Sequence, residues 1–230
     1  IIRGLVGSEM CIRDSPKIAL DLISKSIEVS GYRVGEDIFV ALDAAASEFY
    51  KKNKYVLNDN NKLLTTDELI DYWGGLIKNY PIISIEDPFD EDDINGFAKF
   101  TNLYGKNLQI VGDDLFVTSE KKLSEGIQKE AGNSILIKLN QVGTLTETLD
   151  TISKAKKHNF TTIISHRSGE TEDNFISDLC VGINAGQIKT GSLSRSDRTS
   201  KYNQLLRIEE QLGEEAKFIG NEILNVINKS

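Results

Sequence analysis

The sequence contains only two cysteines, Cys11 and Cys180, among its 230 residues. Two cysteines cannot form the disulfide framework of a small secreted protein, so we expect a reducing, cytoplasmic setting. No run of eighteen apolar residues occurs, and we therefore expect no membrane span. Basic residues are also few, with 27 Lys and Arg against 35 Asp and Glu and a net charge of -8. This balance argues against broad nucleic-acid binding, which needs a basic face.

The shortage of basic residues does not exclude a small anionic substrate, because a few local cations or a metal ion can bind one. Hydrophobic residues make up 39% of the chain and charged residues 27%, which is ordinary for a globular protein. No linker rich in Pro, Gly or Ser divides the chain. We therefore expect one large domain with a sizeable core.

Residues 1–15, IIRGLVGSEMCIRDS, show no sustained helical or strand period. They lack the apolar region and the small-residue cleavage site of a signal peptide. The stretch resembles the translation of a sequencing adapter, so we expect it to be a non-native segment. On this interpretation the domain comprises residues 16–230. A natural, disordered N-terminal segment is the alternative.

From Pro16 onward, apolar strand-like runs alternate with segments of helical composition. Each run is rich in Ile and Val and is closed by a polar residue, as in buried parallel strands. The runs are IFVALDAA, PIISIEDP, LQIVGDDL, SILIKLNQ, FTTIISHRS and GQIKTG. Helices are predicted at 65–79 and 144–158. A further helix places Leu20, Ile23 and Ile27 on one face and ends at Gly31.

The residues that close the six runs recur at a nearly regular interval. They are Asp43, Glu86, Asp113, Lys138, His166 and Lys189. These positions span 146 residues, or about 29 per repeat, and an eight-unit barrel of roughly 250 residues needs about 31 per unit. The spacing predicts an α/β fold with six of the eight strands of a TIM-type (β/α) barrel. A doubly wound sheet is the alternative, but the Gly-rich turn GxGxxG common in that fold is absent.

Three of these strand ends are acids, Asp43, Glu86 and Asp113. The carboxyl ends of parallel barrel strands face one rim, so the three side chains should converge there. Converging carboxylates repel one another unless a cation joins them, and their oxygen atoms suit Mg2+. A helix N-cap is the alternative role for any single acid.

Further acids follow the same strands, and most of them are expected to be solvated loop or capping residues. They are Asp87, Asp90, Glu91, Asp92, Asp93 and Asp114. Asp114 is expected to support the metal site from behind the ligands.

Two lysines close apolar runs, although lysine is rarely buried without a partner. Lys138 lies between Ile137 and Leu139, and Lys189 follows Ile188. At the rim, the metal ion and Lys189 would lower the pKa of Lys138 and leave a neutral amine able to accept a proton. A lysine that extends to solvent from a strand end is the alternative.

The segment SHRSGET follows an apolar run directly and is rich in polar side chains. Arg167 offers a planar fork for a phosphate or carboxylate, and Ser168 adds a hydroxyl. His166 is a candidate for binding the substrate or orienting a neighbour. A metal site, a lysine base and an anion clamp together suit proton abstraction next to a carboxylate, a combination known from enolase-superfamily sites.

Seven segments, between about Ala19 and Gly213, closely resemble the enolase family. In order they are ALDAAASEFY, SIEDPFDEDD, VGDDL, ILIKLNQVGTL, SHRSGETED, GQIKTG and NQLLRIEEQLG. SHRSGET and KLNQ also differ from the corresponding segments of relatives such as mandelate racemase. The resemblance implies a glycolytic lyase that dehydrates 2-phosphoglycerate to phosphoenolpyruvate with Mg2+.

The resemblance also implies a role for each matching residue. Asp43, Glu86 and Asp113 correspond to magnesium ligands, and Lys138 corresponds to the base that removes the proton from carbon 2. The residues that correspond to the substrate-binding set are Arg167, Ser168 and Lys189, with His166 in the same loop.

One part of the family pattern has no counterpart here. Enolases carry a Gly-rich acidic loop with the general-acid glutamate just before the helix that begins near Pro16, where residues 1–15 stand instead. The N-terminal α+β domain and the first two barrel strands are also unmatched. We therefore expect an incomplete barrel that is inactive alone in dehydrating 2-phosphoglycerate, from a parent that forms a homodimer or larger assembly.

Two rival functions remain. Enolases also take on surface-binding roles, so a non-catalytic binding protein with a secondary presence at the cell surface is one rival. A superfamily enzyme acting on a non-phosphorylated acid is the other. The retained acids, lysines and Arg167 disfavour the first, and the anion clamp disfavours the second.

Overall fold

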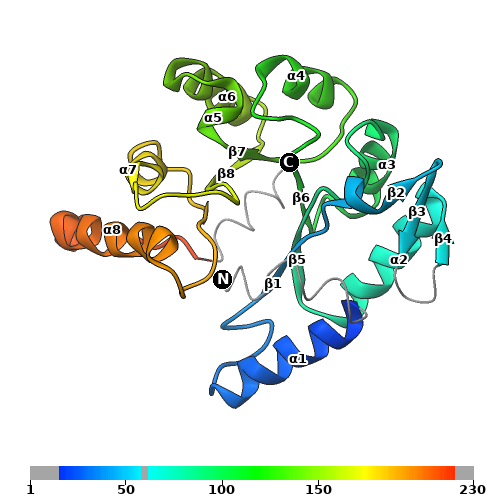
Figure 1. Cartoon of the computed structure of the whole chain (residues 1–230), viewed down its shortest axis with the longest axis horizontal. Helices are drawn as coiled ribbons and strands as arrows, with labels where there is room; N and C mark the ends of the chain where they lie inside the picture. The colour runs from blue at the N-terminus through cyan, green and yellow to red at the C-terminus, as the bar shows by residue number, and fades with distance from the viewer. Residues whose placement is uncertain (1–15, 58–61, 221–230) are drawn as a thin grey trace.

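The computed structural model describes residues 16–57 and 62–220 of the chain (Figure 1). At its centre is a curled sheet of six strands in the order β1-β5-β6-β7-β8-β9. The strands are β1 (Val40–Asp43), β5 (Ile82–Glu86), β6 (Gln109–Gly112), β7 (Ser134–Ile137), β8 (Thr161–Ser165) and β9 (Ile188–Lys189). All neighbouring strands are parallel. The sheet is an incomplete TIM-type barrel, which confirms the fold expected from the repeat.

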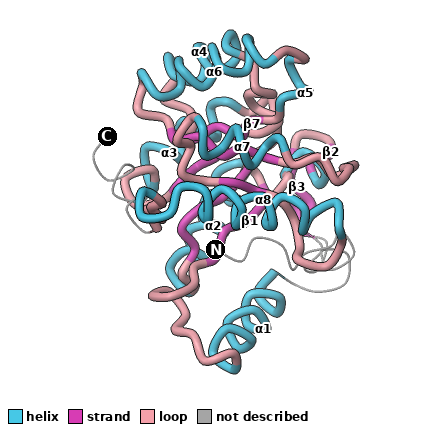
Figure 2. The backbone as a smooth tube through the Cα atoms, turned by 90° about the vertical axis from the view of Figure 1, so that its left-hand side faces the viewer, coloured by secondary structure: helices cyan, strands magenta, loops and turns pink. Residues whose placement is uncertain are grey.

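Helices surround the strands, which lie together in the middle of the molecule (Figure 2). The α-helices are α1 (Pro16–Val29), α2 (Thr66–Asn79), α3 (Ile94–Tyr104), α4 (Glu120–Gln128), α5 (Leu139–Val142), α6 (Leu145–Lys157), α7 (Phe175–Gly182) and α8 (Ser196–Leu212). Two short 3-10 helices are η2 (Ala46–Phe49) and η3 (Gly213–Glu215). The alternation of strand and helix places the loops that follow the strands at one rim.

The predicted helices form where their sequence signals lie. In α1, Leu20 and Ile27 are buried and Ile23 packs against the core, while Gly31 takes the left-handed φ of 83° just beyond the helix end. Helix α2 begins with a capping box in which the Thr65 side chain accepts from the Glu68 backbone and Glu68 accepts from Thr65. The helices predicted before Gly31, at 65–79 and at 144–158 are therefore confirmed.

An antiparallel three-stranded sheet, which was not predicted, interrupts the βα alternation after β1. It contains β2 (Tyr50–Lys51), β3 (Lys54–Leu57) and β4 (Lys62–Leu64) in sequence order. These strands are short and rich in lysine, so they lack the apolar run that marked the barrel strands. Tyr55 is fully buried and anchors the sheet, because its hydroxyl accepts from the Asp90 backbone and donates to Asp93 Oδ2.

The barrel strands have two different faces, because side chains alternate across a strand. The outer face packs against the helices through residues such as Ile110, Ile135 and Ile164. The inner face carries a separate apolar layer, made of Val111, Leu136 and Ile163. The inner face therefore has its own apolar layer. Residues that follow this layer along the strands lie at the rim.

Polar residues border this inner apolar layer at the beginning of the strands. Gln109 Nε2 donates to Ser134 Oγ at 3.2 Å and to Thr161 Oγ1 at 2.8 Å. Two residues beyond the apolar layer, the same alternation leads to Asp113 and Lys138. The period of two thus explains why the strand-end acids and lysines share the inside of the rim.

Candidate active site

The first two predicted acids lie side by side at the rim. Asp43 and Glu86 are register partners and the last residues of β1 and β5. Lys189 Nζ, from the far edge strand β9, lies 2.7 Å from Asp43 Oδ2 and 2.7 Å from Glu86 Oε1. The Glu86 side chain is 1% exposed and that of Asp43 is 48% exposed. The three residues therefore join opposite edges of the sheet.

The charge of Lys189 is maintained by these two acids. Burial lowers the pKa of its amine, but the carboxylates of Glu86 and Asp43 outweigh burial, so that the pKa of Lys189 is raised. Lys189 is accordingly a fixed cation at neutral pH, suited to hold an anion rather than to accept a proton.

The third predicted acid, Asp113, forms an ion pair with the predicted base Lys138. Asp113 directly follows β6 and Lys138 directly follows β7, and the side chains are 10% and 16% exposed. Gln141 Nε2 also donates to Asp113 Oδ1, at 3.3 Å. Among the described helix starts, none of the three predicted acids is a cap, so the capping alternative is wrong for them.

Asp87 is the exception among the neighbouring acids, most of which were expected to be solvated loop or capping residues. It is 4% exposed, and its carboxylate accepts the backbone N–H groups of Asp113 at 2.9 Å and Asp114 at 2.8 Å. Burial raises the pKa of Asp87 well above its usual range, against the effect of these two hydrogen bonds. Its φ of 43° turns the chain sharply after β5, and a side chain at such a turn cannot be placed from strand periodicity. Asp93, by contrast, caps α3 as expected.

One group of described acids could hold a metal ion. Ligand atoms of Asp87, Asp113 and Asp114 lie within 4.8 Å of one another. An all-oxygen set of this kind has the chemistry that a hard divalent cation requires. Only Asp113 belongs both to this group and to the predicted ligand set, whose other members, Asp43 and Glu86, contact Lys189. The acids that the strands bring to the rim thus form two adjoining sets.

The predicted anion-binding residues begin the loop after β8. The Arg167 backbone donates to Glu170 Oε1 at 3.0 Å, and its Nη1 donates to Asn140 Oδ1 at 3.3 Å. Arg167 is half-buried and Ser168 is exposed. Burial raises the pKa of Asp114, and the charge of Arg167 opposes that rise. The loop therefore lies within electrostatic range of the acids.

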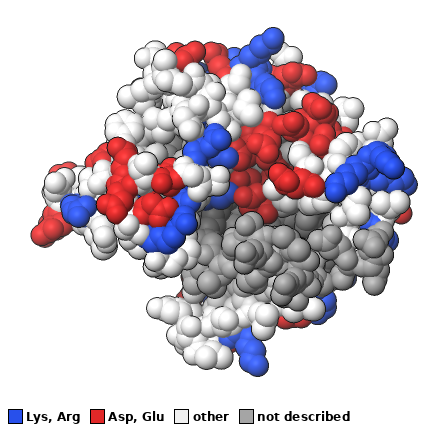
Figure 3. Space-filling model, in the orientation of Figure 1, with Lys and Arg blue, Asp and Glu red and all other residues white. Residues whose placement is uncertain are grey.

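Charge is concentrated on the face seen in Figure 3, where acidic side chains gather near the middle with basic side chains beside them. Within the site, acids and bases are likewise paired, since Lys138 contacts Asp113 and Lys189 contacts Asp43 and Glu86. A concentration of charge of this type favours small ionic ligands.

A protein-family model described as "Enolase, C-terminal TIM barrel domain" matches residues 5–227. The chain belongs to this family. The match confirms the family and barrel assigned from the motifs. Because it begins within residues 1–15, which lie outside the described structure, the boundary at residue 16 stays a prediction. None of the described helices of this enolase-type barrel is long and apolar enough to cross a membrane.

Two buried cations of α8, absent from the predicted site, hold the loop after β8 of the enolase-type barrel. Arg198 Nη1 donates to Arg167 O at 2.7 Å, and Nη2 donates to Ser168 O at 2.8 Å. Lys201 is 1% exposed, and its Nζ lies 2.7 Å from Glu170 Oε2. Neither residue has a sequence signal that separates it from the exposed Arg195 and Arg207 of the same segment.

His166 contacts both Arg198 of α8 and the rim lysine Lys189. Its backbone N–H donates to Lys189 O at 2.9 Å, and its Nδ1 contacts Arg198 Nη1. Burial, with the nearby charges of Arg198 and Lys189, lowers the pKa of His166 to about 4. The ring is therefore neutral at pH 7.

A strained turn supports Lys138 from behind. Val117 and Thr118, both β-branched, have left-handed φ values of 42° and 55°, a conformation costly for such residues. The buried Thr118 hydroxyl accepts from the Lys138 backbone at 2.9 Å and donates to Gln141 Oε1 at 2.6 Å. Since Gln141 contacts Asp113, this turn links the predicted base to its acidic partner.

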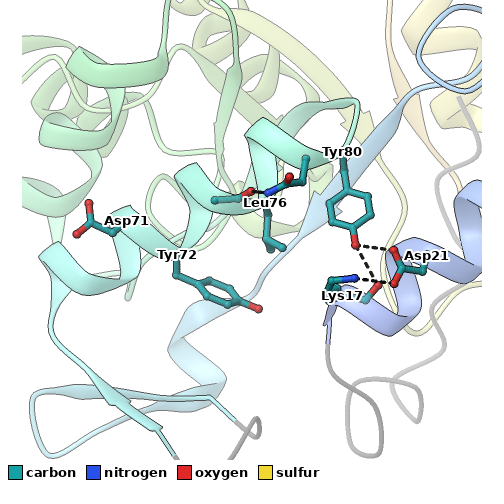
Figure 4. Close-up of a pocket in the computed structure, with 8 residues that line it drawn as sticks. Lys17, Asp21, Asp71, Tyr72, Leu76 and Tyr80 are labelled. Atoms are coloured by element: carbon teal, nitrogen blue, oxygen red, sulfur yellow. Dashed lines mark hydrogen bonds and ion pairs between the residues drawn. The ribbon is translucent and has the colours of Figure 1, made fainter.

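A separate hollow lies between α1 and α2, away from these residues (Figure 4). It has a volume of about 550 Å³. On one side Tyr80 Oη donates to Asp21 Oδ1 at 2.6 Å and Lys17 pairs with Asp21 at 2.9 Å. Its polar groups are thus engaged in exposed contacts between the helices, and none of the predicted site residues lines it. The predicted site residues therefore belong to the rim and not to this hollow.

Proposed function

We propose that this chain carries the catalytic barrel of an enolase, a lyase that dehydrates 2-phosphoglycerate to phosphoenolpyruvate. The observation that carries the proposal is the placement of three acids and two lysines together at the inner rim of a parallel barrel. This arrangement joins Asp43 and Glu86 to Lys189, and Asp113 to Lys138. A role in binding alone would require none of these buried ion pairs.

Magnesium is the proposed cofactor. The candidates to hold it are Asp43, Glu86 and Asp113, with Asp87 and Asp114 beside them. When bound, Mg2+ would act as a Lewis acid toward the substrate carboxylate and stabilise the charge that develops there. Because Asp113 contacts Lys138 and the other two acids contact Lys189, cation binding would compete with both lysines for their carboxylate partners.

Lys138 is the proposed base and takes the proton from carbon 2. Its position after β7, beside Asp113 and supported by Thr118, fixes the amine at the rim. Lys189 stays a cation because its two acids raise its pKa, so it is suited to bind the substrate anion. Arg167 and Ser168 would complete the clamp for the phosphate or carboxylate, and His166 would contact the substrate as a neutral ring.

The dehydration step needs a general acid for the leaving hydroxide, and no position of this chain matches the family's glutamate. Loss of a general acid costs on the order of a hundredfold or more in rate. We therefore expect proton abstraction to be easier to detect than phosphoenolpyruvate formation with this chain alone. A cytoplasmic setting and assembly into a homodimer or larger oligomer belong to the same proposal.

The test is exchange of the carbon 2 proton. The full chain is incubated with 2-phosphoglycerate in D2O, with and without Mg2+, and the carbon 2 signal is followed by proton NMR. Glycerate, which lacks the phosphate, is the matched control substrate. We expect exchange with 2-phosphoglycerate that requires Mg2+, and none with glycerate.

Equal exchange of both acids would instead assign the chain to a superfamily enzyme for non-phosphorylated substrates. A folded chain that exchanges neither acid would contradict the proposed reaction and favour the binding protein.

A further inference from the structure

One ring nitrogen of His166, Nδ1, has a partner on α8. Nδ1 contacts Nη1 of Arg198. An arginine side chain has only donors and stays charged in proteins, so it can approach Nδ1 only if that nitrogen presents its lone pair. A protonated imidazole, or one with hydrogen on Nδ1, would set two donors against each other. The contact therefore favours a neutral ring whose hydrogen is on Nε2.

Arg198 is held in place by the loop that contains His166. Its guanidinium donates to the carbonyl oxygens of Arg167 at 2.7 Å and Ser168 at 2.8 Å. The side chain is 8% exposed, and its Nε lies 3.4 Å from Asp197 Oδ2. With these partners the guanidinium cannot turn away from Nδ1 without losing its hydrogen bonds to both carbonyl groups.

The residue opposite the contact leaves room for it. Gly191 has a φ of 86°, and a Cβ atom there would lie 2.9 Å from Arg198 Cδ and 3.0 Å from His166 Cε1. A larger residue would push the guanidinium and the imidazole apart. The backbone of the loop after β9 is thus shaped to let the two side chains meet.

We propose that Arg198 is a positioning residue that holds His166 as the neutral tautomer with hydrogen on Nε2. The loop then offers a fixed hydrogen-bond donor at Nε2 and no base, which leaves proton abstraction to Lys138. The claim that an anionic oxygen of the substrate accepts from Nε2 rests on the proposed function. The claim about the tautomer does not rest on that function, because it is argued from the contact with Arg198.

Nitrogen-15 NMR tests the tautomer directly, because the sequence contains only two histidines. The full chain is labelled with 15N-histidine and carries His158→Gln, so that His166 gives the remaining ring signals. Spectra are recorded at pH 7 without metal or substrate, so that the result is independent of carbon 2 exchange. Arg198→Met removes the contact. Lys201→Met is the matched control, since it removes the other buried cation of α8 without touching the ring.

We expect the starting protein and the Lys201→Met variant to show neutral His166 with hydrogen on Nε2. In the Arg198→Met variant the two nitrogen shifts should move toward each other, as the tautomers mix. Hydrogen on Nδ1 or a charged ring in the starting protein would overturn the proposal, and this result needs no variant to fold. An unchanged signature in folded Arg198→Met, or its loss in Lys201→Met, would overturn it too.

Discussion

Charged residues at the rim are buried in pairs that compensate one another. Glu86 is 1% exposed and contacts Lys189, and Asp113 contacts Lys138. Removing one partner of such a pair leaves an uncompensated buried charge, which costs about 3–5 kcal/mol. The pairs fix the positions of the acids and lysines at the rim. A buried ion pair adds little net stability, because desolvation offsets the attraction between its charges. The arrangement of the pairs is better explained by function.

His166 should make the protein less stable in mild acid. Its pKa is about 4 in the folded chain and about 6.5 when unfolded. As the pH falls from 6.5 to 4, the unfolded state binds a proton that the folded state does not, so the free energy of unfolding decreases. Because the ring is partly exposed, we expect a loss of about 1–2 kcal/mol rather than the full linkage value.

Urea unfolding between pH 4 and pH 8 measures this loss. His166→Gln should flatten the curve over that interval, because glutamine can accept from Arg198 without titrating. His158→Gln replaces the other histidine, at the exposed C-cap of α6, and is the matched control with which the His166→Gln curve is compared. If stability depended on pH equally in the His166→Gln variant and the starting protein, the lowered pKa of His166 would be contradicted.

Thr118→Val should remove the side-chain hydrogen bonds that link Thr118 to Lys138 and Gln141. Valine keeps the shape but removes the hydroxyl, so that the Lys138 backbone N–H and Gln141 Oε1 lose their partner. Unsatisfied buried groups cost about 1–3 kcal/mol, which should appear as a lower urea midpoint with an unchanged slope. Thr118→Ser retains the hydroxyl and should lose less; equal losses in both variants would show that the methyl group, not the hydroxyl, matters.

At the scale of the elements, two helix glycines have different surroundings. A Cβ atom at Gly126 of α4 would overlap the ring of Phe116, whereas one at Gly75 of α2 would meet nothing within 4 Å. Both glycines lie in helices where alanine has the better propensity. The surroundings therefore decide the sign of a Gly→Ala substitution.

Gly75→Ala should stabilise the protein by about 0.5–1 kcal/mol through helix propensity. Gly126→Ala should destabilise it by about 1–3 kcal/mol, because the added methyl group overpacks the core at Phe116. Thermal unfolding of the two variants side by side measures the difference. Stabilisation by both would mean that the Phe116 ring moves aside at little cost.

The elements differ in how well their sequence predicts them. Buried parallel strands are apolar runs closed by a polar residue, so all six barrel strands could be located, and with them Asp43, Asp113 and Lys138. The short strands β2, β3 and β4 carry no such run, and they were missed. Asp87 was missed because a left-handed turn buries it. Burial of Lys201 depends on the loop that packs over α8, which no local pattern reveals.

Across the whole molecule, six strands contribute to one site. Lys189 of β9 reaches Asp43 of β1, although 146 residues separate them, and these are the two edge strands of the sheet order. Curvature of the sheet therefore brings its edges together at the rim. The central claim is that this assembly lets Lys138 take a proton from carbon 2 of the substrate.

The most direct test compares carbon 2 exchange in D2O for Lys138→Met and Lys99→Met. Lys99 also pairs with an aspartate, Asp67, at 2.6 Å, but on the exterior of the barrel. With 2-phosphoglycerate and Mg2+, Lys138→Met should abolish exchange while Lys99→Met leaves the rate unchanged. Exchange that persists in a folded Lys138→Met variant would contradict the account.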